Sequence, residues 1–166
     1  MLLKNQFQIL SAGKDKSIKI WDFKSVVTAT LNIKDKKHNK ENITLIKDSY
    51  RSEIGHDEEI MVLKASHNEK LFASGSFDKL IKVWNKELKL ELTLTGHKRG
   101  ITDLSFSKYA KILASSSTDK TIKLWNLSDG SCLNTLTGHL ASVLKLHWIY
   151  YGTYIVSGKY ILLNYY

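Results

Sequence analysis

Serine, histidine and aspartate occur together in this chain, and such side chains can act as a nucleophile, a general base and an orienting acid. His97, Ser115 and Asp119 form one such set, and His56 and Asp78 belong to another. A catalytic triad is normally a single constellation in a protein. Because the same residue types return here at a fixed spacing, the pattern favours a structural role over hydrolysis.

A repeat of about 41 residues positions these side chains. In each unit an aspartate lies six residues before a tryptophan, and in two units a Gly-His pair ends 28 residues before that tryptophan. The repeated residues are Asp15 with Trp21, Asp78 with Trp84, and Asp119 with Trp125, together with His56, His97 and His139 of the Gly-His pairs. A fixed period of this size is typical of repeat architectures.

Short runs in which apolar and polar residues largely alternate fill each unit, and this alternation predicts β-strands. The predicted strands are 60–64, 71–74, 80–84 and 89–95 in one unit, and 101–106, 112–115, 121–125 and 132–137 in the next. Four strands in a unit of about 41 residues are typical of one propeller blade.

With a Gly-His near the start of each unit and a Trp-Asp or Trp-Asn near its end, the chain resembles WD40 repeat proteins. The resemblance implies an all-β propeller segment of about three to four four-stranded blades in an incomplete ring. It also implies a hydrogen-bonded relay in each blade. The implied relays are His97, Ser115 or Ser117, Asp119 and Trp125 in one unit, and His56, Ser74 or Ser76, Asp78 and Trp84 in the other.

The repeat register divides the chain into six segments. They are a partial first blade (1–33), a basic insertion loop (34–55), a second blade (56–95), a third blade (97–137), half of a fourth blade (139–158) and a tail that leaves the repeat (159–166). The insertion is predicted because Trp21 and Trp84 are 63 residues apart, against 41 for the next pair. In the fourth unit Ile161 stands where the aspartate is expected, so we expect a half-built blade with an unpaired strand edge.

Several other functional classes lack their motifs in this sequence. No glycine-rich phosphate loop is present, and no His or Cys pair has the spacing of zinc ligands. With one cysteine, Cys132, and no run of about 18 apolar residues, neither a disulfide framework nor a membrane-spanning helix is expected. We therefore expect no enzyme activity, no cofactor, no metal, no small-molecule substrate and no membrane association.

The formal charge of +9 is unevenly distributed. Residues 1–47 contain ten lysines against four acidic residues, while the rest of the chain contains fifteen basic residues against twelve acidic ones. Much of this excess lies at the start of the insertion, where a loop could contact a partner or RNA. A solvated loop is the favoured interpretation, because only two of the 25 basic residues are arginine, the residue that best recognises phosphate.

A closer resemblance narrows the function. The stretch Gly96-His97-Lys98-Arg99-Gly100-Ile101, followed by residues 113–125 and 138–145, resembles the transducin-beta-like family of WD40 subunits of the small-subunit processome. This resemblance covers about residues 56–158, although that family carries two propellers and a helical C-terminal domain. It implies a scaffold of the UTP-B subcomplex that engages small nucleolar RNA and pre-ribosomal RNA in the nucleolus.

The sequence thus predicts a non-enzymatic scaffold that assists ribosomal RNA processing and ribosome biogenesis. Its expected partners are other protein subunits, with small nucleolar RNA and pre-ribosomal RNA as further candidates. The alternative is a general WD40 adaptor, such as a ubiquitin-ligase substrate receptor or a signalling scaffold. We expect the nucleolus as its location, with the cytoplasm as the alternative. The candidate partner contacts are Lys98, Arg99, Phe77 and Thr118.

Overall fold

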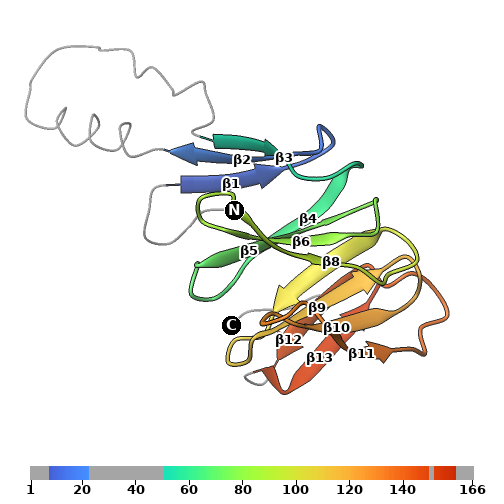
Figure 1. Ribbon diagram of the computed structural model, residues 1–166. Helices are drawn as coiled ribbons and strands as arrows, with labels where there is room; N and C mark the ends of the chain where they lie inside the picture. The colour runs from blue at the N-terminus through green and yellow to red at the C-terminus, as the bar shows by residue number, and fades with distance from the viewer. Residues whose placement is uncertain (1–7, 23–50, 150–151, 160–166) are drawn as a thin grey trace, which may run out of the picture.

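The computed structural model describes residues 8–22, 51–149 and 152–159, and these residues form β-strands that assemble into four antiparallel sheets. The sheets follow one another along the chain, as the colours of Figure 1 show. Within the described ranges no helix is long and apolar enough to cross a lipid bilayer.

The first sheet has three strands, and one of them corrects the predicted boundary of the insertion. Strands β1 (Gln8–Ala12) and β2 (Ser17–Asp22) form a hairpin, and β3 (Arg51–Ile54) pairs with the free side of β2. The prediction that 34–55 is entirely loop is therefore wrong. A blade needs an outer strand beside its third strand, and here that outer strand directly precedes the Gly-His pair at 55–56. The rest of the predicted insertion, 34–50, lies outside the described residues.

Each of the two central sheets has four strands in simple up-and-down order. One contains β4 (Ile60–Ala65), β5 (Leu71–Ser76), β6 (Ile81–Asn85) and β7 (Leu90–Leu94). The other contains β8 (Ile101–Phe106), β9 (Ile112–Ser117), β10 (Ile122–Asn126) and β11 (Cys132–Leu136). The registers of the two sheets correspond: Trp84 pairs with Phe72 in one, and Trp125 pairs with Leu113 in the other.

The last sheet is a hairpin of β12 (Lys145–Ile149) and β13 (Tyr154–Gly158). Within the part of the chain that the structure describes, the other edge of β13 pairs with no strand. Most of the predicted tail, 160–166, lies outside the described residues.

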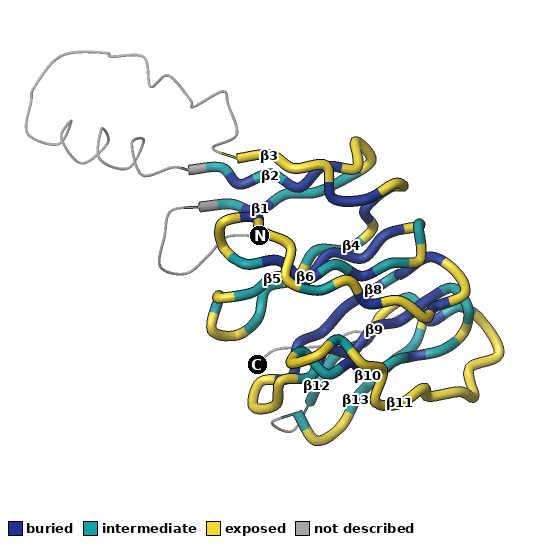
Figure 2. Tube along the Cα trace, viewed as in Figure 1, coloured by how far each residue is buried: buried dark blue, intermediate teal, exposed yellow. Residues whose placement is uncertain are grey.

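The apolar core lies between successive sheets and not within any one of them. Side chains of the second and third sheets, among them Val83, Leu104 and the 1% exposed Trp125, form one buried cluster. Two further clusters join the first sheet to the second and the third to the fourth. Figure 2 shows the buried segments concentrated in the middle of the arc of sheets.

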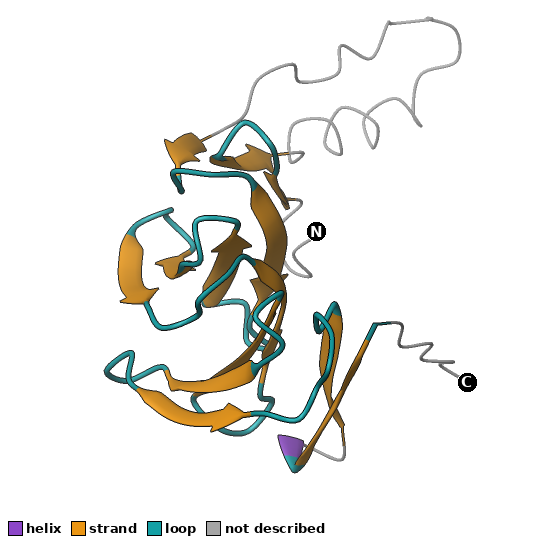
Figure 3. Cartoon of the chain, turned by 90° about the vertical axis from the view of Figure 1, so that its right-hand side faces the viewer, coloured by secondary structure: helices purple, strands orange, loops and turns teal. Residues whose placement is uncertain are grey.

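Each sheet therefore buries its faces against its neighbours, as in a repeat protein. Figure 3 shows the described sheets following one another around an arc that does not close into a ring. The predicted fold class, an all-β WD40 propeller segment in an incomplete ring, is confirmed.

Candidate functional site

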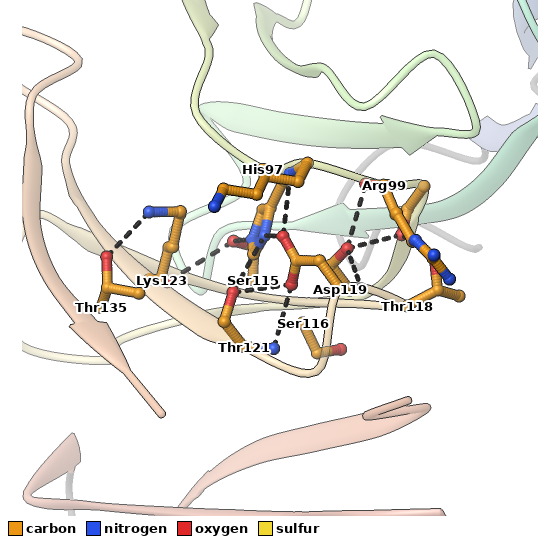
Figure 4. A network of polar contacts seen from close by, with 12 residues as sticks. His97, Arg99, Ser115, Ser116, Thr118, Asp119, Thr121, Lys123 and Thr135 are labelled. Carbon is orange, nitrogen blue, oxygen red and sulfur yellow. Dashed lines mark hydrogen bonds and ion pairs between the residues drawn. The ribbon is translucent and has the colours of Figure 1, made fainter. Parts of the chain in front are cut away.

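A buried relay of side chains crosses the third-blade sheet, β8 to β11. His97 Nδ1 lies 2.8 Å from Asp119 Oδ2, and His97 Nε2 lies 2.8 Å from Ser115 Oγ. Trp125 Nε1 donates a hydrogen bond of 2.8 Å to the same serine oxygen. Figure 4 shows that the histidine, preceding β8, reaches across to the serine of β9 and to the aspartate of the turn before β10.

The second-blade sheet, β4 to β7, repeats this relay almost atom for atom. His56 Nδ1 lies 2.8 Å from Asp78 Oδ2, and His56 Nε2 lies 2.7 Å from Ser74 Oγ. Trp84 Nε1 donates to Ser74 Oγ at 2.9 Å. Two independent copies with the same geometry indicate that the spacing of the repeat determines the network.

Each proton in the relay has one consistent place. Burial lowers the pKa of His97 below its ordinary value, in spite of the opposing hydrogen bond and charge of Asp119, so the imidazole is neutral near pH 7. A neutral ring donates from one nitrogen and accepts at the other. Nδ1–H therefore donates to the Asp119 carboxylate, Nε2 accepts the hydroxyl proton of Ser115, and the serine oxygen accepts the Trp125 N–H. The same order applies to His56, whose pKa burial also lowers.

The aspartate also stabilises its own turn. Asp119 accepts hydrogen bonds from the backbone N–H groups of Lys98 and Thr121 and from the Thr121 hydroxyl. Burial would raise the pKa of this carboxyl, but the hydrogen bonds outweigh that effect and lower the pKa to about 2. Asp78 makes the corresponding bonds to the backbone N–H groups of Leu80 and Asp57, and its pKa is likewise lowered despite burial.

Burial argues against a catalytic role for either relay. Ser74 and Ser115 are both 0% exposed, and both histidine side chains are 0% exposed. Each serine oxygen is already occupied by the tryptophan N–H and the imidazole. A nucleophile must be reachable by its substrate, and both serines are buried, so the contacts that they make are polar contacts within the blade.

Among the described residues, the first and fourth sheets contain parts of this network. In the first sheet Trp21 Nε1 donates to Ser11 Oγ at 2.8 Å, while Asp15 is bonded to Ser17 and, at 2.6 Å, to Lys19. The Lys19 and Ser17 bonds lower the pKa of this exposed carboxyl to about 2.

In the fourth sheet His139 is exposed, and its Nε2 lies 2.9 Å from Ser157 Oγ. This pair has the geometry of the first half of a relay. Ile161, which stands at the aspartate position of this unit, lies outside the described residues.

The structure selects Ser74 and Ser115 over the alternatives that the sequence left open. Ser76 and Ser117 donate instead to backbone carbonyls, of Glu58 and of Gly100. The spacing holds a signal for this choice. A serine ten residues before the tryptophan or 18 after the histidine recurs in every unit, as Ser11, Ser74, Ser115 and Ser157.

Asp103 is a buried polar residue that the sequence did not single out. Its side chain is 3% exposed, and it accepts hydrogen bonds from the backbone N–H groups of Leu104 and Leu146. The ammonium groups of Lys64 and Lys145 lie 3.7 and 3.9 Å from its two carboxylate oxygens. Through these contacts the first strand of the third blade connects to the first strands of both neighbours.

The four candidate partner contacts lie close to one end of the second and third blades. Lys98 and Arg99 are exposed between His97 and β8. Phe77 is 49% exposed, and its ring lies so close to Gly100 that an added Cβ there would approach it to 2.9 Å. The Thr118 backbone N–H donates to the Gly100 carbonyl at 3.1 Å. Phe77 and Thr118 are thus adjacent to the loop that carries the two basic residues.

A metal centre finds no support in the described part of the chain. No group of three or more His, Cys, Asp or Glu side chains there could hold an ion. Cys132 is a free, exposed thiol on β11.

Comparison with known proteins agrees with this geometry. The family described as WD domain, G-beta repeat, matches residues 4–22, 48–85, 88–126 and 130–160. The chain belongs to the WD40 family. The last three matches are offset from the sheets: each begins near the outer strand of one sheet, β3, β7 or β11, and continues through the first strands of the next sheet.

Two kinds of relative are similar to this WD40 chain. U3 small nucleolar RNA-associated protein 13 of Saccharomyces cerevisiae is 37% identical over 87 residues, which are 52% of this chain and 9% of the yeast protein. Solved structures of U3-55K and of the RRP9 WD40 repeats superpose with TM-scores of 0.71 and 0.70, each at 26% identity.

The coverage of these relatives is partial. Both superpositions cover 89% of this chain, but only 41% and 40% of the solved chains. The chain therefore spans less than half the length of the relatives it matches. The resemblance to WD40 proteins that the sequence predicts is confirmed, and the yeast relative is by its name associated with the U3 small nucleolar RNA.

Proposed function

We propose that this chain is a non-enzymatic scaffold in the assembly that processes small-subunit ribosomal RNA. The observation that carries the proposal is the 37% identity to a yeast protein whose name associates it with the U3 small nucleolar RNA. The two similar solved structures, one of them of U3-55K, support the same context. The proposed partners are protein subunits, together with small nucleolar RNA and pre-ribosomal RNA, and the proposed location is the nucleolus.

The site geometry supports a scaffold over an enzyme. The Ser, His and Asp side chains that could perform acyl transfer are already hydrogen-bonded to one another in two closely similar, largely buried relays. A relay of this kind stabilises a blade and leaves its loops free to differ. Partner recognition then depends on loop residues at the blade ends, where propeller proteins have their exposed variable positions.

We assign the first candidate contact surface to Lys98, Arg99, Phe77 and Thr118. Two cations lie beside a half-exposed aromatic ring on adjoining loops of two blades. Such a combination suits an acidic protein segment or the phosphate backbone of RNA. Because charged contacts at an exposed surface are screened by salt, binding at this surface should weaken as ionic strength rises.

Co-purification tests the proposal. The tagged chain should recover U3 small nucleolar RNA and small-subunit pre-ribosomal RNA above the level of an unrelated WD40 chain. The double substitution Lys98→Glu with Arg99→Glu should reduce this recovery. The matched control is Lys14→Glu with Lys89→Glu, which makes the same change of net charge at exposed positions elsewhere.

The alternative adaptor function predicts a different result. If the chain recovers ubiquitin-ligase or signalling subunits and neither RNA, the processome proposal is wrong and the general adaptor replaces it. Equal recovery by the Lys98/Arg99 variant and the control variant would remove these two residues from the contact surface.

A further inference from the structure

A hollow of about 490 Å³ lies between the second and third blades, at the end opposite the relays. Its walls are the β4–β5 turn, the β8–β9 turn and Leu127 just after β10. Because the strands alternate in direction, these turns lie at the other end of each sheet from the turns that carry Asp78 and Asp119. The hollow is therefore separate from the surface around Lys98 and Arg99.

The chemistry of the lining is basic and aromatic over an apolar floor. His67, Lys108 and Lys111 contribute basic groups, and no aspartate or glutamate is among the residues that line it. Tyr109 is 65% exposed, and the Lys108 ammonium lies over its ring, 5.2 Å from the ring centre, in a cation–π contact. The floor consists of Leu71, Phe106 and Leu127.

The walls are held by their own backbone hydrogen bonds. In one turn Ser66 N–H donates to the Leu71 carbonyl, and the Ser66 hydroxyl oxygen accepts from Leu71 N–H. In the other, Ser107 N–H donates to the Ile112 carbonyl. Leu127 N–H donates to the Lys111 carbonyl, which ties the floor to the second wall. A preformed hollow of this volume falls in the range of ligand sites, and binding there has little ordering cost.

We propose that this hollow binds a nucleotide of single-stranded RNA. Its base stacks on the Tyr109 ring, and the adjoining phosphates lie against Lys108 and Lys111. An exposed aromatic side chain beside cations is the combination that holds unstacked bases without sequence preference. In a duplex the bases are stacked and paired, so that a single strand is required. This inference deepens the proposed function. It rests on that function in one respect, because the proposed function is the reason for preferring RNA to an acidic peptide as the ligand.

Binding of a fluorescein-labelled ten-nucleotide RNA of mixed sequence to the 166-residue chain tests the site. Lys108→Glu with Lys111→Glu should weaken binding at least tenfold. It should also reduce the slope of log K against log salt by about 1.4, the value for two lost phosphate contacts on a single strand. Tyr109→Ala should weaken binding roughly 5- to 150-fold through lost stacking, whereas Tyr109→Phe should retain it.

Controls keep the outcome independent of folding. Lys14→Glu with Lys89→Glu changes the net charge by the same amount at exposed positions that do not line the hollow and should leave affinity unchanged. Circular dichroism checks that each variant keeps its β-sheet. Photo-crosslinking with 4-thiouridine RNA should label the peptides that contain residues 66–71 or 107–111. Crosslinks confined to other peptides would overturn the site, whatever the affinities.

Two further outcomes would contradict the proposed RNA site. A poly-glutamate peptide that binds at the hollow while RNA does not would replace RNA with an acidic protein segment. Variants of the hollow that bind RNA as the parent does would refute the proposal, even if the chain still co-purifies with processome RNA. Conversely, RNA binding at the hollow without such co-purification would support the site and contradict the proposed processome role.

Discussion

The second and third blades differ from the first sheet in what the same Asp-x5-Trp motif achieves. In the two blades the aspartate is nearly buried and bonded to a histidine from the preceding loop. In the first sheet Asp15 has an exposed side chain and pairs with Lys19 on its own hairpin. The tryptophans follow the same division, since Trp84 and Trp125 are buried and Trp21 is only partly so.

The difference shows that the motif alone does not make the relay. Local sequence places the aspartate in its turn, because short acceptors bond the N–H two residues ahead in all three copies. Burial requires a first strand and its Gly-His loop to pack over that turn. The relay therefore depends on the packing of the whole blade. Substitutions at corresponding positions of the first sheet and of the two central blades should change the free energy of unfolding by different amounts.

The largest difference is expected for the tryptophans. Trp125→Ala removes a ring that is 1% exposed and packed between two sheets, and it should lower the free energy of unfolding by about 3–5 kcal/mol. The substitution also removes the hydrogen bond that the Trp125 N–H donates to Ser115 Oγ. Trp21→Ala should cost clearly less, because Trp21 is only partly buried. Chemical denaturation of both variants measures the difference, and equal losses would contradict it.

Substitution of the aspartate should also destabilise the third blade more than the first sheet, but by less than substitution of the tryptophan. Asp119→Ala leaves the His97 Nδ1–H and two backbone N–H groups without their acceptor, which should cost about 1–3 kcal/mol. Asp15→Ala at the exposed first-sheet turn should shift the unfolding midpoint little. If Asp119→Ala melts with the parent protein yet loses partner binding, Asp119 is a contact residue and its structural role is wrong.

Much of the fold could be predicted because the repeat places strands and turns at fixed offsets. The predicted run 101–106 coincides with β8, and the predicted run 112–115 lies within β9, Ile112–Ser117. The outer strand of the first blade was missed because the long interval between Trp21 and Trp84 was assigned wholly to a loop. The strand that precedes each Gly-His pair was the available signal, and it would have indicated Arg51–Ile54.

The site could be predicted only in part. The residue types of the relay followed from the resemblance, but the choice between Ser115 and Ser117 depends on which hydroxyl the tryptophan N–H reaches across the sheet. Asp103 could not be found from the repeat, because the corresponding positions in the neighbouring blades hold Val62 and Lys145. Its role depends on packing between blades, which spacing along one blade does not reveal.

The pH dependence of stability should also distinguish the complete blades. Burial lowers the pKa of His56 and His97 in the folded chain, so the unfolded chain binds more protons as the pH falls through 6.5. The stability that the two neutral histidines contribute is fully present above pH 6.5 and is lost as the pH falls below it. A second loss follows as the pH falls from 3.8 towards about 2, where Asp119 is protonated.

Proton resonances of the imidazole rings give a direct check. The Cε1–H signals of His56 and His97 should shift with midpoints below 6.5, and the unfolding free energy should decrease over the same range. Midpoints at or above 6.5 would mean that the rings are charged in the folded chain. In that case both nitrogens would carry protons, and the assigned direction of the Ser115 hydroxyl bond would be wrong.

The smallest effects are expected for the ion pairs through which Asp103 of the third blade contacts the second blade and the partial fourth sheet. The Lys64 and Lys145 side chains are 45% and 59% exposed, and their ammonium groups lie 3.7 and 3.9 Å from Asp103. Ion pairs of such exposed lysines typically contribute about 0–1 kcal/mol. By contrast, the Leu146 N–H bond to Asp103 is buried and joins the two sheets directly.

Lys145→Met should therefore change the free energy of unfolding by less than about 1 kcal/mol, and the change should shrink at high salt. Asp103→Ala should cost more than Lys64→Met and Lys145→Met together, since it leaves the Leu146 N–H unsatisfied in a buried setting. A double-mutant cycle with Lys145→Met and Asp103→Asn isolates the ion pair from the backbone bond. A coupling energy well above 1 kcal/mol would show that the lysine, and not the backbone bond, holds the fourth sheet against the third blade.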